Sequence, residues 1–183
     1  MHGHPHSICV FCGSRSGTDP AYAQAAHDMG TGIGTRGWRL IYGAGDVGLM
    51  GTVAKAAQGA QAETFGVIPE HLRAWEVGKS DLDTFIVTET MHERKKVMFM
   101  NADALVVLPG GAGSLDEFFE VLTWAQIKLH GKPIVLVNVG GYWDPLIALI
   151  DHVIAQGFAD PSLRDLFMVH TTVAAALDAL SPA

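Results

Sequence analysis

The chain has 183 residues, a formal net charge of −7 and 49% hydrophobic residues. This length supports one domain with a substantial core, and the hydrophobic content excludes a disordered chain. The negative charge argues against a general nucleic-acid or anionic-membrane binder, because such proteins use positive charge to neutralise phosphates. We expect a single domain over residues 1–183, with residues 1–7 as a flexible tail.

Targeting signals and cysteine usage indicate the cellular compartment of the protein. No apolar run approaches the ~20 residues of a membrane helix, and the N-terminus lacks the basic-then-apolar pattern of a signal peptide. Cys9 and Cys12 are spaced like a redox or zinc pair, but no second pair follows. Residues three apart on a strand point to opposite faces, so we expect both cysteines to be small buried side chains. These features predict a cytoplasmic protein.

Strands and helices are predicted to alternate along the chain. Apolar runs predict strands at 8–12, 38–42, 64–68, 84–88, 105–108, 134–139 and 166–170. Helical spacing predicts helices from Pro20 to about Gly30 or beyond, and at 52–58, 91–101, 114–130, 146–156 and 172–180, with a loop or short helix at 71–83. The strands are apolar on both faces, as in parallel sheets covered by helices on both sides. The predicted fold class is α/β, a Rossmann-like doubly wound parallel sheet.

A glycine turn links the strand at 105–108 to the following helix, and it contains Gly110, Gly111 and Gly113. The first amides of a helix lack internal partners, so a turn of this kind can hold a phosphate at the positive end of the helix dipole. It is not a Walker loop, because the Gly-Lys-Ser/Thr ending is absent. Ser114 and Glu117 also match the pattern of a capping box, which is the structural alternative to a catalytic role.

Two further glycine turns, at Gly13 and Gly43, also follow predicted strands. Ligands of parallel sheets bind beyond the carboxyl ends of the strands, so the three turns should gather at one site. The stretch Gly43–Gly51 contains G-x-G-x-x-G, and Glu70 follows at about the distance of a ribose-binding acid. A nicotinamide-dependent oxidoreductase is therefore an alternative, although this motif normally follows the first strand.

The helix at 91–101 carries the charged run His92-Glu93-Arg94-Lys95-Lys96. Such runs usually form a solvated face. Because this helix immediately precedes the strand that feeds the glycine turn, Arg94 and Lys95 are also candidates to face a phosphate or carboxylate. Lys96 replaces the second histidine of an H-E-x-x-H motif, and the other histidines show no ligand spacing, so we expect no catalytic metal.

Two motifs together resemble the Lonely Guy (LOG) family of cytokinin riboside 5′-monophosphate phosphoribohydrolases. They are Thr90-Met91-His92-Glu93-Arg94-Lys95 and Pro109-Gly110-Gly111-Ala112-Gly113-Ser114-x-x-Glu117. Supporting segments are Cys12–Ser14, Tyr42–Gly51, Thr123–Gln126 and Asn138–Tyr142, so the likeness runs from about Ile8 to His170. Ser114 stands where threonine is more usual, and Ala44 interrupts a usual glycine triplet and adds a methyl group near the expected pocket.

The resemblance implies hydrolysis of the N-glycosidic bond of an adenosine-type 5′-monophosphate, to the free base and ribose 5-phosphate. It implies a homodimer with the site near the interface, and a purine nucleoside monophosphate as the partner rather than nucleic acid or membrane. By position, Arg94 and Glu117 match the catalytic pair. The substrate-binding candidates are Glu76, Arg94, Lys95, Gly110, Gly111, Gly113, Ser114 and Thr123, joined by Gly13, Ser14, Gly43 and Gly45 from the other turns.

The chemistry of this reaction agrees with the residues. Cleavage develops positive charge on the ribose, which the Glu117 carboxylate stabilises while orienting water, and Arg94 neutralises the phosphate or positions Glu117. No cofactor is needed. A non-catalytic carrier of a nucleotide or of molybdenum cofactor is the alternative, because such carriers share a related fold and glycine turn. Relatives have also been labelled lysine decarboxylases, but no lysine has a recognisable pyridoxal phosphate setting.

Overall fold

The computed structural model describes residues 5–73 and 81–182. The strands are β1 (Ser7–Phe11), β2 (Arg39–Tyr42), β3 (Glu63–Pro69), β4 (Thr84–Thr88), β5 (Ala104–Val107), β6 (Ile134–Val137) and β7 (Met168–His170). The α-helices are α1 (Pro20–Thr35), α2 (Gly48–Gly59), α3 (Glu70–Arg73), α4 (Met91–Asn101), α5 (Ala112–Gln126), α6 (Asp144–Ala155) and α7 (Val173–Ala179). Two 3₁₀ helices, η1 (Val139–Gly141) and η2 (Pro161–Leu166), complete the description.

All the strands pair in parallel in one sheet, in the order β4-β3-β2-β1-β5-β6-β7. The chain winds outward from β1 to β4 and then returns to the other side of β1 through β5, so the direction of winding reverses between β1 and β5. At such a switch point the loops that follow the two central strands diverge and leave a crevice. Phe11 and Val107 are paired in register, so the loops leave the sheet at the same level.

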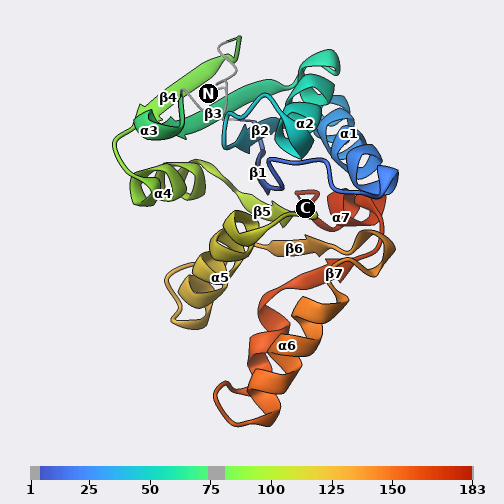
Figure 1. Cartoon of the computed structure of the whole chain (residues 1–183), viewed down its shortest axis with the longest axis vertical. Coiled ribbons are helices and arrows are strands. Elements are labelled where there is room, and N and C mark those ends of the chain that lie inside the picture. Colours follow the sequence, from blue (N-terminus) through green and yellow to red (C-terminus); the bar gives the residue numbers. More distant parts are fainter. Residues whose placement is uncertain (1–4, 74–80, 183) are drawn as a thin grey trace.

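Helices cover both faces of the sheet, with α1, α2 and α7 on one side and α4, α5 and α6 on the other (Figure 1). The side-chain alternation of β1 explains this, because Ile8 and Val10 pack with the first group and Cys9 and Phe11 with the second. The predicted α/β doubly wound fold is confirmed.

The cysteine prediction is also confirmed. Both thiols are free and buried, with Cys9 in the core on the α5 side and Cys12 in the core on the α1 side. Burial raises the pKa of both thiols, and the nearby Glu117 carboxylate adds to the effect. Both cysteines therefore behave as apolar core residues.

Several predicted boundaries are wrong. Helix α2 begins at Gly48, four residues before its expected start, and β6 and β7 are shorter than expected. Ser7 is a buried residue of β1, so the predicted tail over 1–7 extends too far. Helix α5 begins at Ala112, two residues before the expected start, and ends at Gln126 rather than His130. The amides of Lys128 and Leu129 donate to the carbonyls of Ala125 and Trp124, and Lys128 adopts a φ of 62°. This is the Schellman arrangement, so the helix stops there and not at Gly131.

In the part of the chain that the structure describes, no helix is both long and apolar enough to cross a membrane.

Candidate functional site

Two adjoining pockets lie at the crevice between the loops that follow β1 and β5. The first pocket has a volume of about 230 Å³ and the second about 380 Å³. Gly13, Ser14 and Gly111 line both, so the pockets share one wall. The main-chain amide of Gly13 donates to the carbonyl of Pro109 at 3.0 Å, which holds the two loops together beneath that wall.

The start of α5 forms one side of the first pocket, through Gly111, Ala112, Gly113 and Ser114. Gly111 is the N-cap and no side chain caps the helix, so the capping-box interpretation of Ser114 and Glu117 is wrong. Ser114 lies inside the first turn instead, and it is buried. The exposed first amides of the helix are therefore left without a side-chain acceptor, as an anion site requires.

The glycines of this turn have different reasons to be glycine. A Cβ on Gly110 would lie 2.0 Å from the hydroxyl oxygen of Ser114, so close packing excludes any side chain there. A Cβ on Gly111 or Gly113 would meet nothing within 4 Å among the described residues. Packing does not require glycine at those two positions, and their bare backbone keeps the helix start accessible to a ligand.

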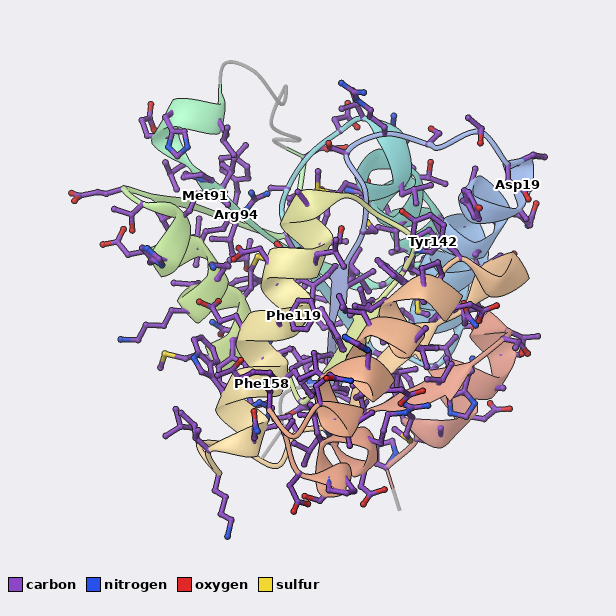
Figure 2. All side chains as sticks on the ribbon, turned by 60° about the horizontal axis from the view of Figure 1, so that its bottom comes forward. Asp19, Met91, Arg94, Phe119, Tyr142 and Phe158 are labelled. Atoms are coloured by element: carbon purple, nitrogen blue, oxygen red, sulfur yellow. The ribbon has the colours of Figure 1, made fainter. Side chains whose placement is uncertain are left out.

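Glu117 and Arg94 line the same pocket, so the structure brings the predicted catalytic pair together. Glu117 follows Ser114 by three residues, which is nearly one helical turn, and it is half-buried. Figure 2 shows Arg94 and Met91 beside the first turns of α5. A carboxylate, a guanidinium group and helix-start amides therefore surround one hollow.

Arg94 is buried on α4, and its guanidinium group holds two backbone segments. Nε donates to the carbonyl of Val67 at 3.0 Å, and Nη2 donates to the carbonyl of Gly43 at 2.6 Å. A Cβ on Gly43 would lie 2.1 Å from the same Nη2, so glycine is required there. Arg94 thus fixes the end of β3 and the turn after β2 at the edge of the first pocket.

Lys95 points toward α5 and is not among the described residues that line the first pocket. Its ammonium group lies 2.9 Å from Asp116 and 3.1 Å from Glu120. Desolvation lowers the pKa of Lys95, but the hydrogen bonds to the two carboxylates outweigh it and raise the pKa above its usual value. The solvated-face interpretation is wrong for Arg94 and Lys95, which are both buried, although His92, Glu93 and Lys96 are exposed.

The family motif also contains a structural element that the sequence analysis missed. The hydroxyl of Thr90 accepts from the amide of Glu93, and the Glu93 carboxylate accepts from the amide of Thr90. This capping box sets the first residue of α4, and therefore which residues of the helix face inward. The Thr-x-x-Glu spacing was the signal for it.

The turn after β2 does not present a nucleotide site of its own. The amides of Leu49 and Met50 at the start of α2 both donate to the carbonyl of Gly13, at 3.1 and 3.4 Å. They are occupied by protein, which argues against a pyrophosphate at this G-x-G-x-x-G segment. Glu70, the expected ribose-binding acid, is exposed and pairs with Arg73 at 3.4 Å.

The other residues of that turn are mostly turned away from the pockets. Gly43 lines the first pocket, whereas Gly45 packs against Met50, whose methyl carbon would lie 2.8 Å from a Cβ there. Ala44 is fully buried with a φ of 58° and packs against Gly66. Its methyl group does not line either pocket, contrary to the expectation that it changes the ligand site.

Among the described residues, the predicted binding residues Lys95, Gly45 and Thr123 line neither pocket. Thr123 is exposed on α5, about 13 Å along the helix from Ser114. Glu76 lies outside the described residues.

The apolar wall of the first pocket was not predicted from the sequence; it is formed by Phe11, Met50, Leu72, Met91 and Met98. Met91, Arg94 and Met98 are spaced i, i+3 and i+7, so a helical face on α4 was the available signal. Among the residues that the structure describes, no group of three histidines, cysteines or acids is placed to hold a metal ion.

Comparison with known proteins gives the family. Residues 50–180 match the family model described as "Possible lysine decarboxylase". Neither the buried Lys95 nor the partly buried Lys132 is among the described residues that line the first pocket. A cytokinin riboside 5′-monophosphate phosphoribohydrolase from Rhodococcoides fascians is 42% identical over 177 residues, covering 96% of this chain and 89% of that protein. One from Arabidopsis thaliana is 42% identical over 161 residues, covering 88% and 71%.

Among solved structures, the molybdenum cofactor carrier protein of Chlamydomonas reinhardtii matches with a TM-score of 0.74 at 24% identity, covering 97% of this chain and 96% of that one. At this identity the likeness shows the fold alone. The sequence relatives are much closer, and the match spans the strands, the glycine turn and the helix that carries Arg94. The chain therefore belongs to the Lonely Guy family of cytokinin riboside 5′-monophosphate phosphoribohydrolases.

Proposed function

We propose that this protein hydrolyses the N-glycosidic bond of purine nucleoside 5′-monophosphates, namely cytokinin riboside 5′-monophosphates and AMP, to the free base and ribose 5-phosphate. The observation that carries the proposal is the single pocket lined by the uncapped start of α5 and by the Glu117 carboxylate. Relatives that are 42% identical to this chain over the matched residues bear the name of this activity.

The 5′-phosphate is assigned to the start of α5, against the amides of Gly111, Ala112 and Gly113. Those amides carry the positive end of the helix dipole, and bare glycine backbone permits close approach. Binding energy from the phosphate is remote from the broken bond, so it orients the ribose for reaction. Because Glu117 is about one helical turn further along α5, it is placed to face the anomeric carbon of the ribose.

Glu117 supports the bond cleavage electrostatically. As the bond from C1′ to the base nitrogen breaks, positive charge develops on the ribose, and a nearby carboxylate stabilises it. Water adds its hydroxyl group to C1′, its proton passes by way of the carboxylate, and the base leaves protonated on the nitrogen. Arg94 lines the same pocket while its other contacts hold the Gly43 turn, so it shapes the site as well as adding positive charge.

The apolar wall of the first pocket supports a base with an apolar N6 substituent. Met50, Leu72, Met91 and Met98 lie on that wall, and flexible thioether side chains adapt to ligands of different shape. The 42% identity to named cytokinin riboside 5′-monophosphate phosphoribohydrolases agrees with this assignment.

A homodimer is part of the proposal, and it rests on one exposed face of α5. Phe119 and Ile127 are 38% and 59% exposed, and Thr123 lies between them on the same helical face. Figure 2 shows Phe119 on the outer side of α5. A second copy of the chain that packs on this face buries Phe119 and Ile127. In that dimer Thr123 lies at the interface, where it can contact a ligand. Analytical ultracentrifugation of the wild type and of Phe119→Asp tests it, and a monomeric wild type contradicts it.

The activity is tested by incubating purified protein with AMP, a prenylated AMP and adenosine, and separating the free bases by chromatography. We expect base release from both monophosphates and very little from adenosine. Equal turnover of adenosine and AMP would show that the 5′-phosphate does not contribute to binding or orienting the substrate. Tight binding of a nucleotide that is recovered unaltered would instead support the alternative function, a non-catalytic carrier.

A further inference from the structure

The second pocket lies across the shared wall from the proposed catalytic site. It is the larger of the two, and it takes its outer walls from Tyr22 of α1 and from Tyr142 after η1. Figure 2 shows Tyr142 and Arg94 on opposite sides of the first turn of α5. A ligand held at the shared wall therefore faces Glu117 in one direction and the tyrosine-lined pocket in the other.

The walls of the second pocket are held by specific contacts. The Tyr142 hydroxyl donates to the carbonyl of Gly110 at 2.6 Å, which fixes the glycine turn against the pocket. The rings of Tyr22 and Tyr142 meet edge to face, with centroids 5.2 Å apart. Gly17 has a φ of 74°, and a Cβ there would lie 2.7 Å from the Tyr22 ring, so the loop after β1 packs tightly on that ring. The pocket is built into the fold.

The lining of the second pocket suits an anion. Arg15 contributes a guanidinium group, and within residues 5–73 and 81–182 it has no ion-pair partner. The exposed side chains of Ser14 and Ser16 add hydroxyl groups. No acidic side chain is found among the described residues of this lining, whereas Asp116 and Glu117 line the first pocket. The two pockets therefore differ in charge.

We propose that the second pocket binds a second phosphoryl group, so that nucleoside 5′-diphosphates occupy this site and compete with the monophosphate substrate. This inference rests on the proposed function, because it takes the α-phosphate to lie at the start of α5. A β-phosphoryl group extends from the α-phosphate away from the ribose and so enters the second pocket. There the planar guanidinium group of Arg15 forms charge-assisted hydrogen bonds to phosphate oxygens. The volume leaves space for the group with bound water.

The test has two parts. Calorimetry measures AMP and ADP binding to the Glu117→Gln variant, in which turnover does not interfere. Inhibition of AMP hydrolysis by ADP is then measured on the wild type. We expect ADP to compete with AMP and to bind at least as tightly. Arg15→Gln is expected to weaken ADP binding about tenfold and AMP binding less than twofold, because the lost contact is to the β-phosphoryl group. Arg164→Gln removes an arginine of η2 that pairs with Asp151, and it is the matched control. We expect it to leave the affinities for AMP and ADP unchanged.

Ser16→Tyr provides a second variant, because a large side chain in the pocket should exclude the β-phosphoryl group while AMP still binds. The proposal is overturned if ADP binds ten times more weakly than AMP, or if Arg15→Gln weakens AMP and ADP equally. Absence of AMP hydrolysis by the wild type is a different result. It contradicts the proposed activity, while the calorimetric comparison still decides whether the second pocket takes a phosphoryl group.

Discussion

The ammonium group of Lys95 lies 2.9 Å from the carboxylate of Asp116, the residue that directly precedes Glu117. Its neighbour Arg94 holds the carbonyls of Gly43 and Val67 on the opposite side of the same pocket. Two consecutive side chains of α4 therefore tie the β2–β3 side of the crevice to α5. The relative position of the pocket walls depends on this one helix.

The first prediction concerns Lys95, which we infer positions α5. Lys95→Met keeps the buried stem but leaves Asp116 and Glu120 without their cation, so the first turns of α5 lose their tie to α4. We expect the kcat for AMP to fall about tenfold with a smaller change in KM. Lys95→Arg should restore most of the kcat. Steady-state kinetics of the two variants check this, and an unchanged kcat with a raised KM would instead indicate direct substrate contact.

The second prediction concerns the acidic side chain of the first pocket. Glu117→Gln is nearly isosteric but cannot stabilise the charge that develops on the ribose, so we expect kcat to drop by about 10³-fold. Binding of AMP, measured by calorimetry, should persist. Glu120→Gln is the comparison variant, and we expect it to lower kcat by no more than about tenfold, because Glu120 acts only through its contact with Lys95. Near-normal turnover by Glu117→Gln would leave this glutamate with a structural role alone.

The third prediction concerns the two main-chain contacts of Arg94. Arg94→Lys keeps the charge, but a single ammonium group cannot reproduce the separate hydrogen bonds of Nε and Nη2. Leaving a buried carbonyl unpaired costs about 1–3 kcal/mol, so urea denaturation should show a loss of stability in that range. The kcat should fall as well, since the Gly43 turn borders the pocket. Wild-type stability in this variant would show that the two hydrogen bonds are dispensable.

The fourth prediction concerns the end of α5. Lys128 adopts a left-handed φ of 62° at the C′ position, which costs a non-glycine residue about 1 kcal/mol. Lys128→Gly should therefore raise the free energy of unfolding by about 0.5–1 kcal/mol without affecting activity. Gly131→Ala serves as the comparison, and we expect no loss of stability there, because Gly131 does not end the helix and a Cβ there would meet nothing within 4 Å among the described residues.

The fifth prediction is a dependence of stability on pH. The Asp83 carboxylate accepts hydrogen bonds from the amide and the hydroxyl of Thr64, at 2.7 and 2.8 Å, and these lower its pKa below the usual 3.8. A lowered folded-state pKa contributes stability above the unfolded-state pKa, and this contribution is lost as the pH falls through the folded-state value. The stability gap between wild type and Asp83→Asn should thus be constant above about pH 5. Below that pH the gap should narrow, which urea denaturation at pH 7 and pH 3 measures. A gap that stays constant down to pH 3 would contradict it.

The sequence by itself determined the architecture, because the patterns that specify a strand or a helix are local. Continuous apolar runs such as Leu105–Leu108 predicted buried parallel strands, and the register of Cys9 and Cys12 predicted their opposite faces. Parallel topology then placed the turns at Gly13, Gly43 and Gly110 at one edge. The motif resemblance predicted Arg94 and Glu117 as the catalytic pair, and both line one pocket in the structure.

Contacts between distant residues were decided by the tertiary structure alone. Nothing in the spacing of Lys95 and Asp116 indicates that they pair. The sequence also does not show that Thr123 faces outward while Ser114 is buried. The second pocket joins Arg15, Tyr22 and Tyr142, which come from three separate segments. Side chains far apart in the chain meet only after the strand order and the facing of each helix are set, and those depend on the packing of the whole core.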